Sequence, residues 1–150
     1  MATLKFSVEG ESINATKLQA KARQFEFIVD EPPALGGNDE GANPVEYLLG
    51  SYAGCLNVVF HLVAKEEGVK INSLGIKVSG DIDPSRLLGS SRFNRAGFQS
   101  IDVDFYIDSD SDEATINELV SKVQSRCPVN DNLSNVTQLN YSVVNSAVTA

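Results

Sequence analysis

The chain has 150 residues, of which 42% are hydrophobic and 21% charged, and 12 Lys and Arg against 20 Asp and Glu give a net charge of −8. These values are typical of one globular domain spanning residues 1–150, and the acidic balance argues against nucleic acid or an anionic membrane surface as a partner. No apolar run approaches the ~20 residues of a membrane span, and residues 1–20 contain no signal-peptide core, so we expect a cytoplasmic protein.

The N-terminal third predicts short strands. Apolar and polar residues alternate in residues 4–8 and again in residues 25–29, after a polar bend. This alternation is typical of strands with one buried face. Two prolines and three glycines in residues 31–41 then interrupt regular structure.

A long helix is predicted to begin at Pro44 and to end near Gly68, about 24 residues later. Asn43 is a suitable N-cap, and Glu46 lies three residues after it, as in a capping box. One face carries apolar side chains at helical spacing. The opposite face includes Gly50 and Gly54, which cost a helix ~1 kcal/mol each relative to alanine. We therefore expect a central helix that packs on more than one side, with a second subunit as a candidate neighbour.

The second half predicts two strands, a helix and a last strand. Apolar residues alternate in residues 74–82 and 101–107. The helix is expected to start near Asp110 or Ser111 and to be stopped by Pro128. A final strand is predicted at residues 139–144. The order βββ–α–ββ–α–β is an α+β arrangement, in which helices cover an antiparallel sheet.

The loop between the two predicted strands contains Arg86, Arg92 and Arg95, and no acidic residue occurs from Pro84 to Ser100. These arginines could receive an anionic substrate. The favoured interpretation is a solvated loop, because arginine is mostly exposed.

Only two cysteines are present, Cys55 and Cys127, 72 positions apart. They form no Cys-x-x-Cys pair, and the single His61 cannot complete a four-ligand zinc site with them. A disulfide-stapled secreted scaffold would need more cysteines. The two thiols are therefore either buried packing residues or a redox pair.

Cys55 lies in the middle of the long helix, on the flank of its apolar stripe. The simplest interpretation is a small buried hydrophobe. An unperturbed thiol is only a few per cent ionised at pH 7, so a reactive Cys55 requires something that stabilises its thiolate. The helix dipole fades within its first turn, so a nearby cation would be needed. Arg23 is the only arginine among the early strands, although a surface charge is its favoured interpretation.

Cys127 is expected at the C-terminal end of the second helix, where the dipole disfavours a thiolate. This position suits a resolving thiol, which attacks after the first sulfur has been oxidised. The alternative is core packing, because Cys127 continues the apolar stripe of that helix.

With these features the chain resembles the OsmC/Ohr family of thiol-dependent hydroperoxide reductases. The resemblance rests on residues 43–46 (Asn-Pro-Val-Glu), residues 51–55 (Ser-Tyr-Ala-Gly-Cys) and residues 127–129 (Cys-Pro-Val). An upstream arginine and the loop at residues 32–37 also fit, so the resemblance covers most of the chain.

The resemblance implies an intertwined homodimer with each active site at the subunit interface. It implies that Cys55 is the peroxidatic thiolate and that Cys127 condenses with its sulfenic acid to form a disulfide, which a dithiol reductant resets. Arg23 matches the arginine that activates the thiolate. No metal, flavin or other cofactor is implied.

Glu46 departs from the pattern of the better-characterised peroxidases, in which glutamate directly follows the proline. Here Val45 intervenes, and this slip rotates the carboxylate by ~100° around the helix. Nine residues separate Glu46 from Cys55, about 13 Å along the axis and on opposite faces. Glu46 could still hold an arginine near the other subunit's thiol, but a capping role is sufficient.

We therefore expect a dimeric cysteine peroxidase that prefers bulky organic hydroperoxides to hydrogen peroxide, because apolar residues flank Cys55. One alternative is a thiol redox sensor or small-molecule binding module on the same fold. The other is a structural dimerisation domain with two inert cysteines.

Overall fold

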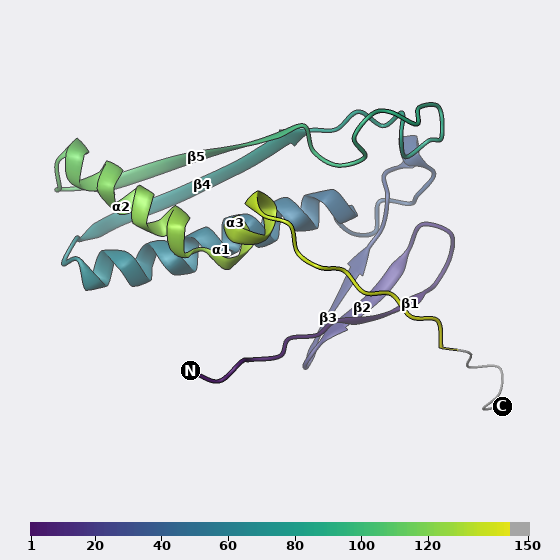
Figure 1. The fold of residues 1–150 in the computed structure, drawn as a ribbon, viewed down its shortest axis with the longest axis horizontal. Coiled ribbons are helices and arrows are strands. Elements are labelled where there is room, and N and C mark those ends of the chain that lie inside the picture. Colours follow the sequence, from purple (N-terminus) through teal and green to yellow (C-terminus); the bar gives the residue numbers. More distant parts are fainter. Residues whose placement is uncertain (145–150) are drawn as a thin grey trace.

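The computed structural model describes residues 1–144, as a small sheet, a long helix and a hairpin with two further helices (Figure 1). The elements, in chain order, are β1 (Glu9–Ser12), β2 (Leu18–Ala22), β3 (Phe25–Val29), the short 3₁₀ helix η1 (Pro33–Leu35), α1 (Pro44–Glu66), β4 (Ile71–Asp81), β5 (Ser100–Ser109), α2 (Glu113–Arg126) and α3 (Pro128–Ser134).

Strands β1, β2 and β3 form an antiparallel sheet in that order. Ala20 of β2 pairs with Gly10 of β1 on one side and with Phe27 of β3 on the other. The strand predicted at residues 25–29 is confirmed, whereas residues 4–8 are extended chain that precedes β1. No strand of this chain pairs with residues 4–8 within the described part, and Phe6 is 86% exposed.

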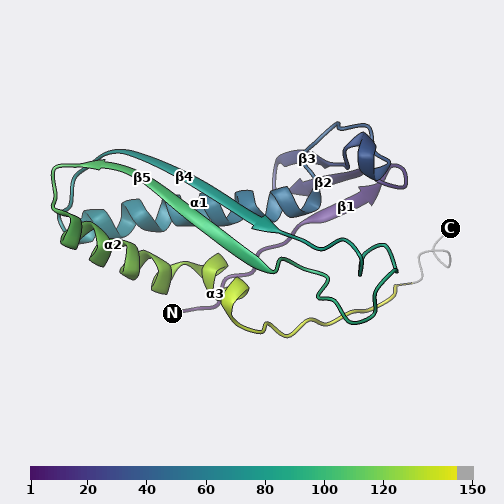
Figure 2. The ribbon, with the colours of Figure 1, turned by 90° about the horizontal axis from the view of Figure 1, so that it is seen from above.

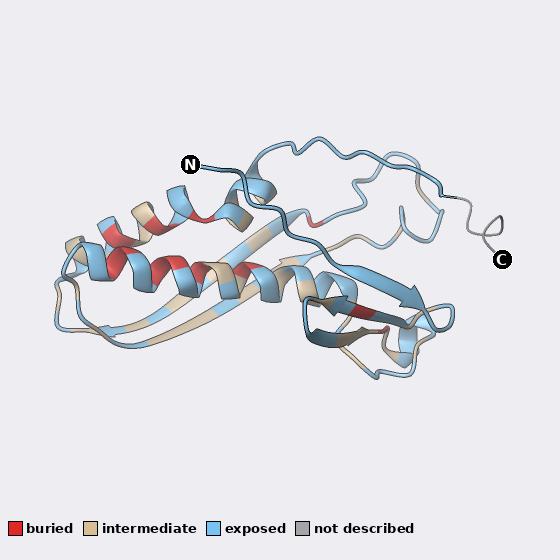
Figure 3. Cartoon of the chain, turned by 90° about the horizontal axis from the view of Figure 1, so that it is seen from below, coloured by how far each residue is buried: buried red, intermediate tan, exposed pale blue. Residues whose placement is uncertain are grey.

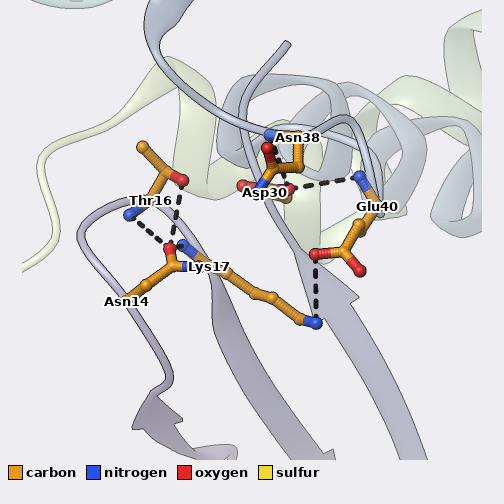
Figure 4. Close-up of polar contacts among 6 residues, drawn as sticks. All are labelled: Asn14, Thr16, Lys17, Asp30, Asn38 and Glu40. Carbon is orange, nitrogen blue, oxygen red and sulfur yellow. Dashed lines mark hydrogen bonds and ion pairs between the residues drawn. The ribbon is translucent and has the colours of Figure 1, made fainter. Parts of the chain in front are cut away.

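The loop after β3 is held by a buried carboxylate, that of Asp30. Its Oδ2 accepts the backbone N–H groups of Asn38 and Glu40, both at 3.2 Å, and Glu40 forms an ion pair with Lys17 at 3.1 Å (Figure 4). The N–H of Glu31 contributes most to holding the pKa of Asp30 below its usual value, while burial opposes this and the N–H of Glu40 adds to it. These bonds fix the path of the chain from β3 into α1.

Helix α1 begins and ends as the sequence predicts. The Asn43 Oδ1 accepts the N–H of Glu46 at 2.9 Å, and the Glu46 Oε2 accepts the N–H of Asn43 at 2.8 Å, which confirms the capping box. Glu67 is the C-cap, and Gly68 follows it with a φ of 69°, a conformation that glycine adopts without strain.

Strands β4 and β5 form a long antiparallel hairpin, which confirms both predicted strands. Ile76 pairs with Phe105 and Val78 with Val103, so the alternating apolar side chains of the two strands lie on one face. Helices α1 and α2 pack beside this hairpin (Figure 2). The Phe60 and Phe105 rings, with centroids 5.6 Å apart, join α1 to β5.

The core lies between the helices and the hairpin, and its buried residues follow one face of α1 and one face of α2 (Figure 3). They are Tyr52, Leu56, Val59, Phe60, Val63, Ala64, Leu119, Val123 and Cys127.

The C-terminal region differs from the sequence expectation. Asp112 caps α2, its Oδ1 accepting the N–H of Thr115 at 2.8 Å, so the helix begins at Glu113 and not at residue 110 or 111. Pro128 follows the end of α2 but also begins α3, because proline is well suited to a first helical position. The predicted strand at residues 139–144 is wrong: no neighbouring strand pairs with these residues, which are extended and exposed. Residues 145–150 lie outside the described part.

One side of α1 is not covered in this chain, although the helix contacts β4, α2 and α3. Gly50 and Gly54 face open space, and Val58 is 65% exposed. By length and composition alone α1 could also cross a membrane, but the central helix of a packed core passes the same test. Because its other face forms the core described above, we interpret α1 as a core helix.

The β1–β3 sheet lies beyond the N-terminal end of α1, apart from the core (Figures 1 and 2). It contacts α1 near Tyr47, whose hydroxyl donates to the carbonyl of Ile28 at 2.7 Å and whose ring lies 5.4 Å from that of Phe27. The α+β architecture is therefore confirmed, with the sheet divided into a three-stranded part and a hairpin.

Candidate active site

The two cysteines meet where α1, α2 and α3 come together. The Cys55 and Cys127 Sγ atoms are 2.9 Å apart and are not bonded to each other. This separation exceeds a covalent S–S bond of ~2.05 Å by only about 0.9 Å. Cys127 is 1% exposed, whereas Cys55 is partly exposed. The fold thus places one accessible and one buried thiol in contact.

Cys127 occupies the junction between two helices. It is the C-cap of α2 and the N-cap of α3, and its Sγ accepts the N–H of Asn130 at 3.4 Å. The sequence predicts only the first of these positions. The side chain that completes the apolar face of α2 is thereby turned toward α1 and Cys55.

The pKa of the Cys127 thiol is raised above its usual value. Burial is the largest cause, and the hydrogen bond that this thiol donates to Cys55 is the next, while the N–H of Asn130 acts in the opposite direction. A buried thiol that donates to its neighbour stays protonated at neutral pH. This protonation state leaves the Cys55 sulfur as the hydrogen-bond acceptor of the pair.

Tyr52 and Asn130 connect α1 to α3 beside the thiols. The Tyr52 hydroxyl donates to the Asn130 Oδ1 at 2.6 Å. Burial, together with the sulfurs of Cys127 and Cys55, raises the pKa of Tyr52, so its hydroxyl remains a donor. Tyr52 precedes Cys55 by three residues and Asn130 follows Cys127 by three, so each lies one helical turn from a thiol. Three hydrogen bonds thus connect Tyr52, Asn130, Cys127 and Cys55 in that order.

A pocket of about 430 Å³ opens next to this set. Tyr52, Asn130 and Arg95 are among its lining residues, whereas the two cysteines are not. Most of the remaining lining is apolar, including Val45, Leu48, Ile82, Phe98, Ile101 and Leu133. Its size and apolar character fit a small organic ligand.

Arg23 is not brought to the thiols within this chain. It occupies the turn between β2 and β3 with a φ of 55°, and its guanidinium lies 5.0 Å from the centre of the Phe25 ring. It forms no ion pair with any acidic side chain of residues 1–144. One chain therefore gives Arg23 no contact with the two thiols.

Glu46 is also remote from the thiols. Its carboxylate caps the start of α1, nine residues before Cys55, as the one-residue slip in the sequence predicts. As for metals, the described residues contain no group of three or more His, Cys, Asp or Glu that could hold one.

The sequence interpretation does not include Asn130, and it considers Arg95 for an anionic substrate but favours a solvated loop, whereas the structure places Arg95 at the pocket. Asn130 lies in α3, whereas the sequence predicts that the preceding helix ends at Pro128 and predicts no helix after it. The proline at a first helical position, followed by Asp131, is the signal that could have revealed this helix.

The chain is similar to known proteins in sequence and in fold. The family model described as OsmC-like protein matches residues 36–142, which include α1, both cysteines and the pocket. The chain belongs to the OsmC-like family. The resemblance inferred from the motifs is thereby confirmed.

A relative of this OsmC-like protein carries an activity in its name. It is the hydroperoxide reductase of Mycoplasma pneumoniae, 26% identical over 139 residues, which are 93% of this chain and 94% of the relative.

Solved structures of other OsmC-like proteins share the fold. An OsmC-like protein from Mycoplasma pneumoniae is 24% identical with a TM-score of 0.78, over 90% of this chain and 91% of the other. The organic hydroperoxide resistance protein OhrB of Bacillus subtilis is 25% identical with a TM-score of 0.57, over 87% of this chain and 90% of that protein.

Proposed function

We propose that this OsmC-like protein is a two-cysteine peroxidase that reduces organic hydroperoxides to alcohols. The observation that carries the proposal is the 2.9 Å contact between the accessible Cys55 and the buried Cys127. The name of the Mycoplasma pneumoniae relative, hydroperoxide reductase, supports the same chemistry.

The first step uses Cys55. Its thiolate attacks the distal oxygen of ROOH, an S–O bond forms as the O–O bond breaks, and the leaving alkoxide takes a proton to become ROH. The sulfur is oxidised to a sulfenic acid, and the peroxide is reduced by two electrons.

The second step uses Cys127. Its sulfur attacks the sulfenic sulfur of Cys55, the S–S bond forms, and the hydroxyl leaves with the thiol proton as water. The hydrogen bond from Cys127 to Cys55 supports this division of roles, because a protonated Cys127 does not compete for the peroxide. A dithiol reductant then reduces the disulfide by thiol–disulfide exchange and restores both thiols.

The pocket supports the substrate class. Its apolar lining would bury the organic part of a hydroperoxide, at about 25 cal/mol for each Å² removed from water. Hydrogen peroxide has no such part and gains nothing from this surface. Bulky alkyl or aryl hydroperoxides should therefore be preferred.

The proposal includes a homodimer, because the single chain leaves complementary parts exposed. The apolar residues Leu4, Phe6 and Val8 are exposed next to the unpaired edge of the N-terminal segment. The face of α1 that carries Gly50, Gly54 and Val58 is also uncovered. A second copy that covers both surfaces would offset the cost of two helical glycines by allowing close backbone approach.

A homodimer also offers a position for Arg23. Its guanidinium has no acidic partner among the described residues, and Arg23 lies in the turn between β2 and β3, in the sheet that lies apart from the core (Figure 1). In an intertwined dimer this turn would reach the other protomer's active site. There the cation would stabilise the Cys55 thiolate and orient the peroxide.

The decisive experiment is consumption of cumene hydroperoxide with excess dithiothreitol by the wild type, Cys55→Ser and Cys127→Ser. We expect Cys55→Ser to lose turnover completely. Cys127→Ser should lose the intramolecular disulfide, seen by mass spectrometry, while one oxidisable thiol remains. The matched control is Ser125→Ala, a change on the exposed surface of α2, the helix that ends at Cys127. This variant should keep full turnover.

Undiminished turnover in Cys55→Ser would contradict this mechanism. A redox sensor would give a different result, a single oxidation of both thiols without sustained peroxide consumption. Inert structural cysteines would react with a thiol reagent only after the protein is unfolded.

A further inference from the structure

The loop from Pro84 to Ser100 carries positive charge, and part of it lines the pocket. It contains Arg86, Arg92 and Arg95 and no acid, whereas the rest of the protein is strongly acidic. The peroxidase mechanism proposed above uses none of these arginines. The structure distinguishes the three arginines by their positions.

Arg95 lines the pocket beside the thiols, whereas Arg86 and Arg92 are not among the lining residues. Arg86 instead donates from its guanidinium to the carbonyl oxygen of Arg92 within the loop. Arg95 forms no ion pair with the acidic side chains of residues 1–144. One guanidinium is therefore available at the pocket wall.

Arg95 is the one charged residue among those that line the pocket. Tyr52 and Asn130, which are hydrogen-bonded to each other, also line it, and the N–H of Asn130 donates to the Cys127 sulfur. Most of the other lining residues are apolar, such as Leu48 and Phe98, and the uncharged polar residues Gln99, Ser100 and Ser134 are also among them. A ligand that matches this arrangement has a reactive group, an apolar body and an anionic group.

We propose that Arg95 makes the pocket select organic hydroperoxides that carry a carboxylate. This inference rests on the proposed peroxidase function and adds a specificity-determining residue to it. The planar guanidinium fork matches a carboxylate with two parallel hydrogen bonds. A phosphate group would be less well served, since the two neighbouring arginines do not line the pocket.

Binding can be tested without turnover by two probes of equal shape, 4-isopropylbenzoate and 4-isopropylbenzamide, titrated into the reduced protein by calorimetry. We expect the benzoate to bind about three- to tenfold more tightly, as for a partly solvated charged pair. Arg95→Gln should abolish this difference. Arg92→Gln removes the same charge from the same loop outside the pocket and should preserve it. Added salt should reduce the preference.

Turnover provides a second measurement. The ratio of kcat/KM for cumene hydroperoxide carrying a para carboxylate to that for cumene hydroperoxide itself should fall about three- to tenfold in Arg95→Gln, mainly through KM. Arg92→Gln, which lies outside the pocket, should reduce cumene hydroperoxide alone at the wild-type rate.

Equal binding of the two probes to the wild type would overturn the inference, as would equal effects of Arg92→Gln and Arg95→Gln. Failure of the proposed function has a separate signature. If neither peroxide is consumed while the preference for the benzoate still depends on Arg95, then Arg95 binds a carboxylate in the pocket and the proposed peroxidase function is wrong.

Discussion

Tyr52 is the side chain that links the helix of the first thiol to the helix that follows the second. Its hydroxyl donates to Asn130, and the backbone N–H of Asn130 donates to the Cys127 sulfur. The position of Cys127 relative to Cys55 thus depends on a hydrogen bond that neither thiol makes. We interpret Tyr52 as a positioning residue for disulfide formation.

The variant Tyr52→Phe tests this interpretation, because it keeps the buried ring and removes the hydrogen bond, at a cost of about 1 kcal/mol. We expect disulfide formation to slow about fivefold while the first oxidation of Cys55 changes less than about twofold. The measurement is the lifetime of the Cys55 sulfenic acid, trapped with dimedone and followed by mass spectrometry.

Tyr47→Phe is the matched control. Tyr47 lies on the same helix and loses a comparable hydrogen bond, to the carbonyl of Ile28, away from the thiols. Equal slowing of disulfide formation in both variants would show that Tyr52 acts through general stability alone.

Helix α1 illustrates how one element carries both structural and chemical residues. Its first turn is fixed by Asn43 and Glu46, and its third and fourth turns present Tyr52 and Cys55 to the site. In this chain the Glu46 carboxylate accepts a hydrogen bond from the Asn43 N–H. A role for Glu46 near a partner's thiol would require it to leave this bond.

Replacement of Glu46 separates capping from chemistry. Glu46→Gln retains an acceptor oxygen for the Asn43 N–H, so stability and peroxide turnover should both stay close to wild type. Glu46→Ala should lose about 0.5–1 kcal/mol in the free energy of unfolding, measured in urea, with the rate constant for peroxide unchanged.

Asn43→Ala removes the other half of the capping box and should destabilise the protein by a similar ~1 kcal/mol. A tenfold loss of turnover in Glu46→Gln at unchanged stability would contradict the capping role and favour a carboxylate that acts in the reaction.

The whole molecule has a core on one side and a projecting sheet on the other (Figures 1 and 3). Arg23 stands on the projecting sheet, while both thiols lie beside the core. This separation is the strongest structural reason to expect that two copies act together. It also makes the contribution of Arg23 testable in trans.

Cys55→Ser and Arg23→Gln should each lose most of their activity when expressed alone. Co-expression should restore about a quarter of wild-type turnover, because half of randomly formed dimers contain one intact site of two. The measurement is cumene hydroperoxide consumption by the purified mixture, with light scattering to give the oligomeric state.

Arg92→Gln co-expressed with Cys55→Ser is the control, and its activity should come from the Arg92→Gln subunits without any gain from mixing. Absence of restoration in the first pair, or a monomer by light scattering, would contradict an arginine supplied by the partner.

The elements that depend mainly on interactions between neighbouring residues could be predicted from the sequence. Helix α1, its capping box and the two strands of the hairpin follow from spacing and capping chemistry, because these features are short-range. The family resemblance followed from the residues around the two cysteines.

The remaining features depend on contacts between distant segments. Residues 4–8 and 139–144 have strand-like alternation, but a strand forms only where another strand offers its backbone hydrogen bonds, and this chain offers none in the described part. The 2.9 Å approach of Cys55 to Cys127 arises because α2 and α3 pack on α1, across 72 residues of sequence. Arg95 likewise joins the site through folding of its loop. The sequence therefore singled out the two candidate thiols, and tertiary packing supplied their contact, their unequal burial and the pocket beside them.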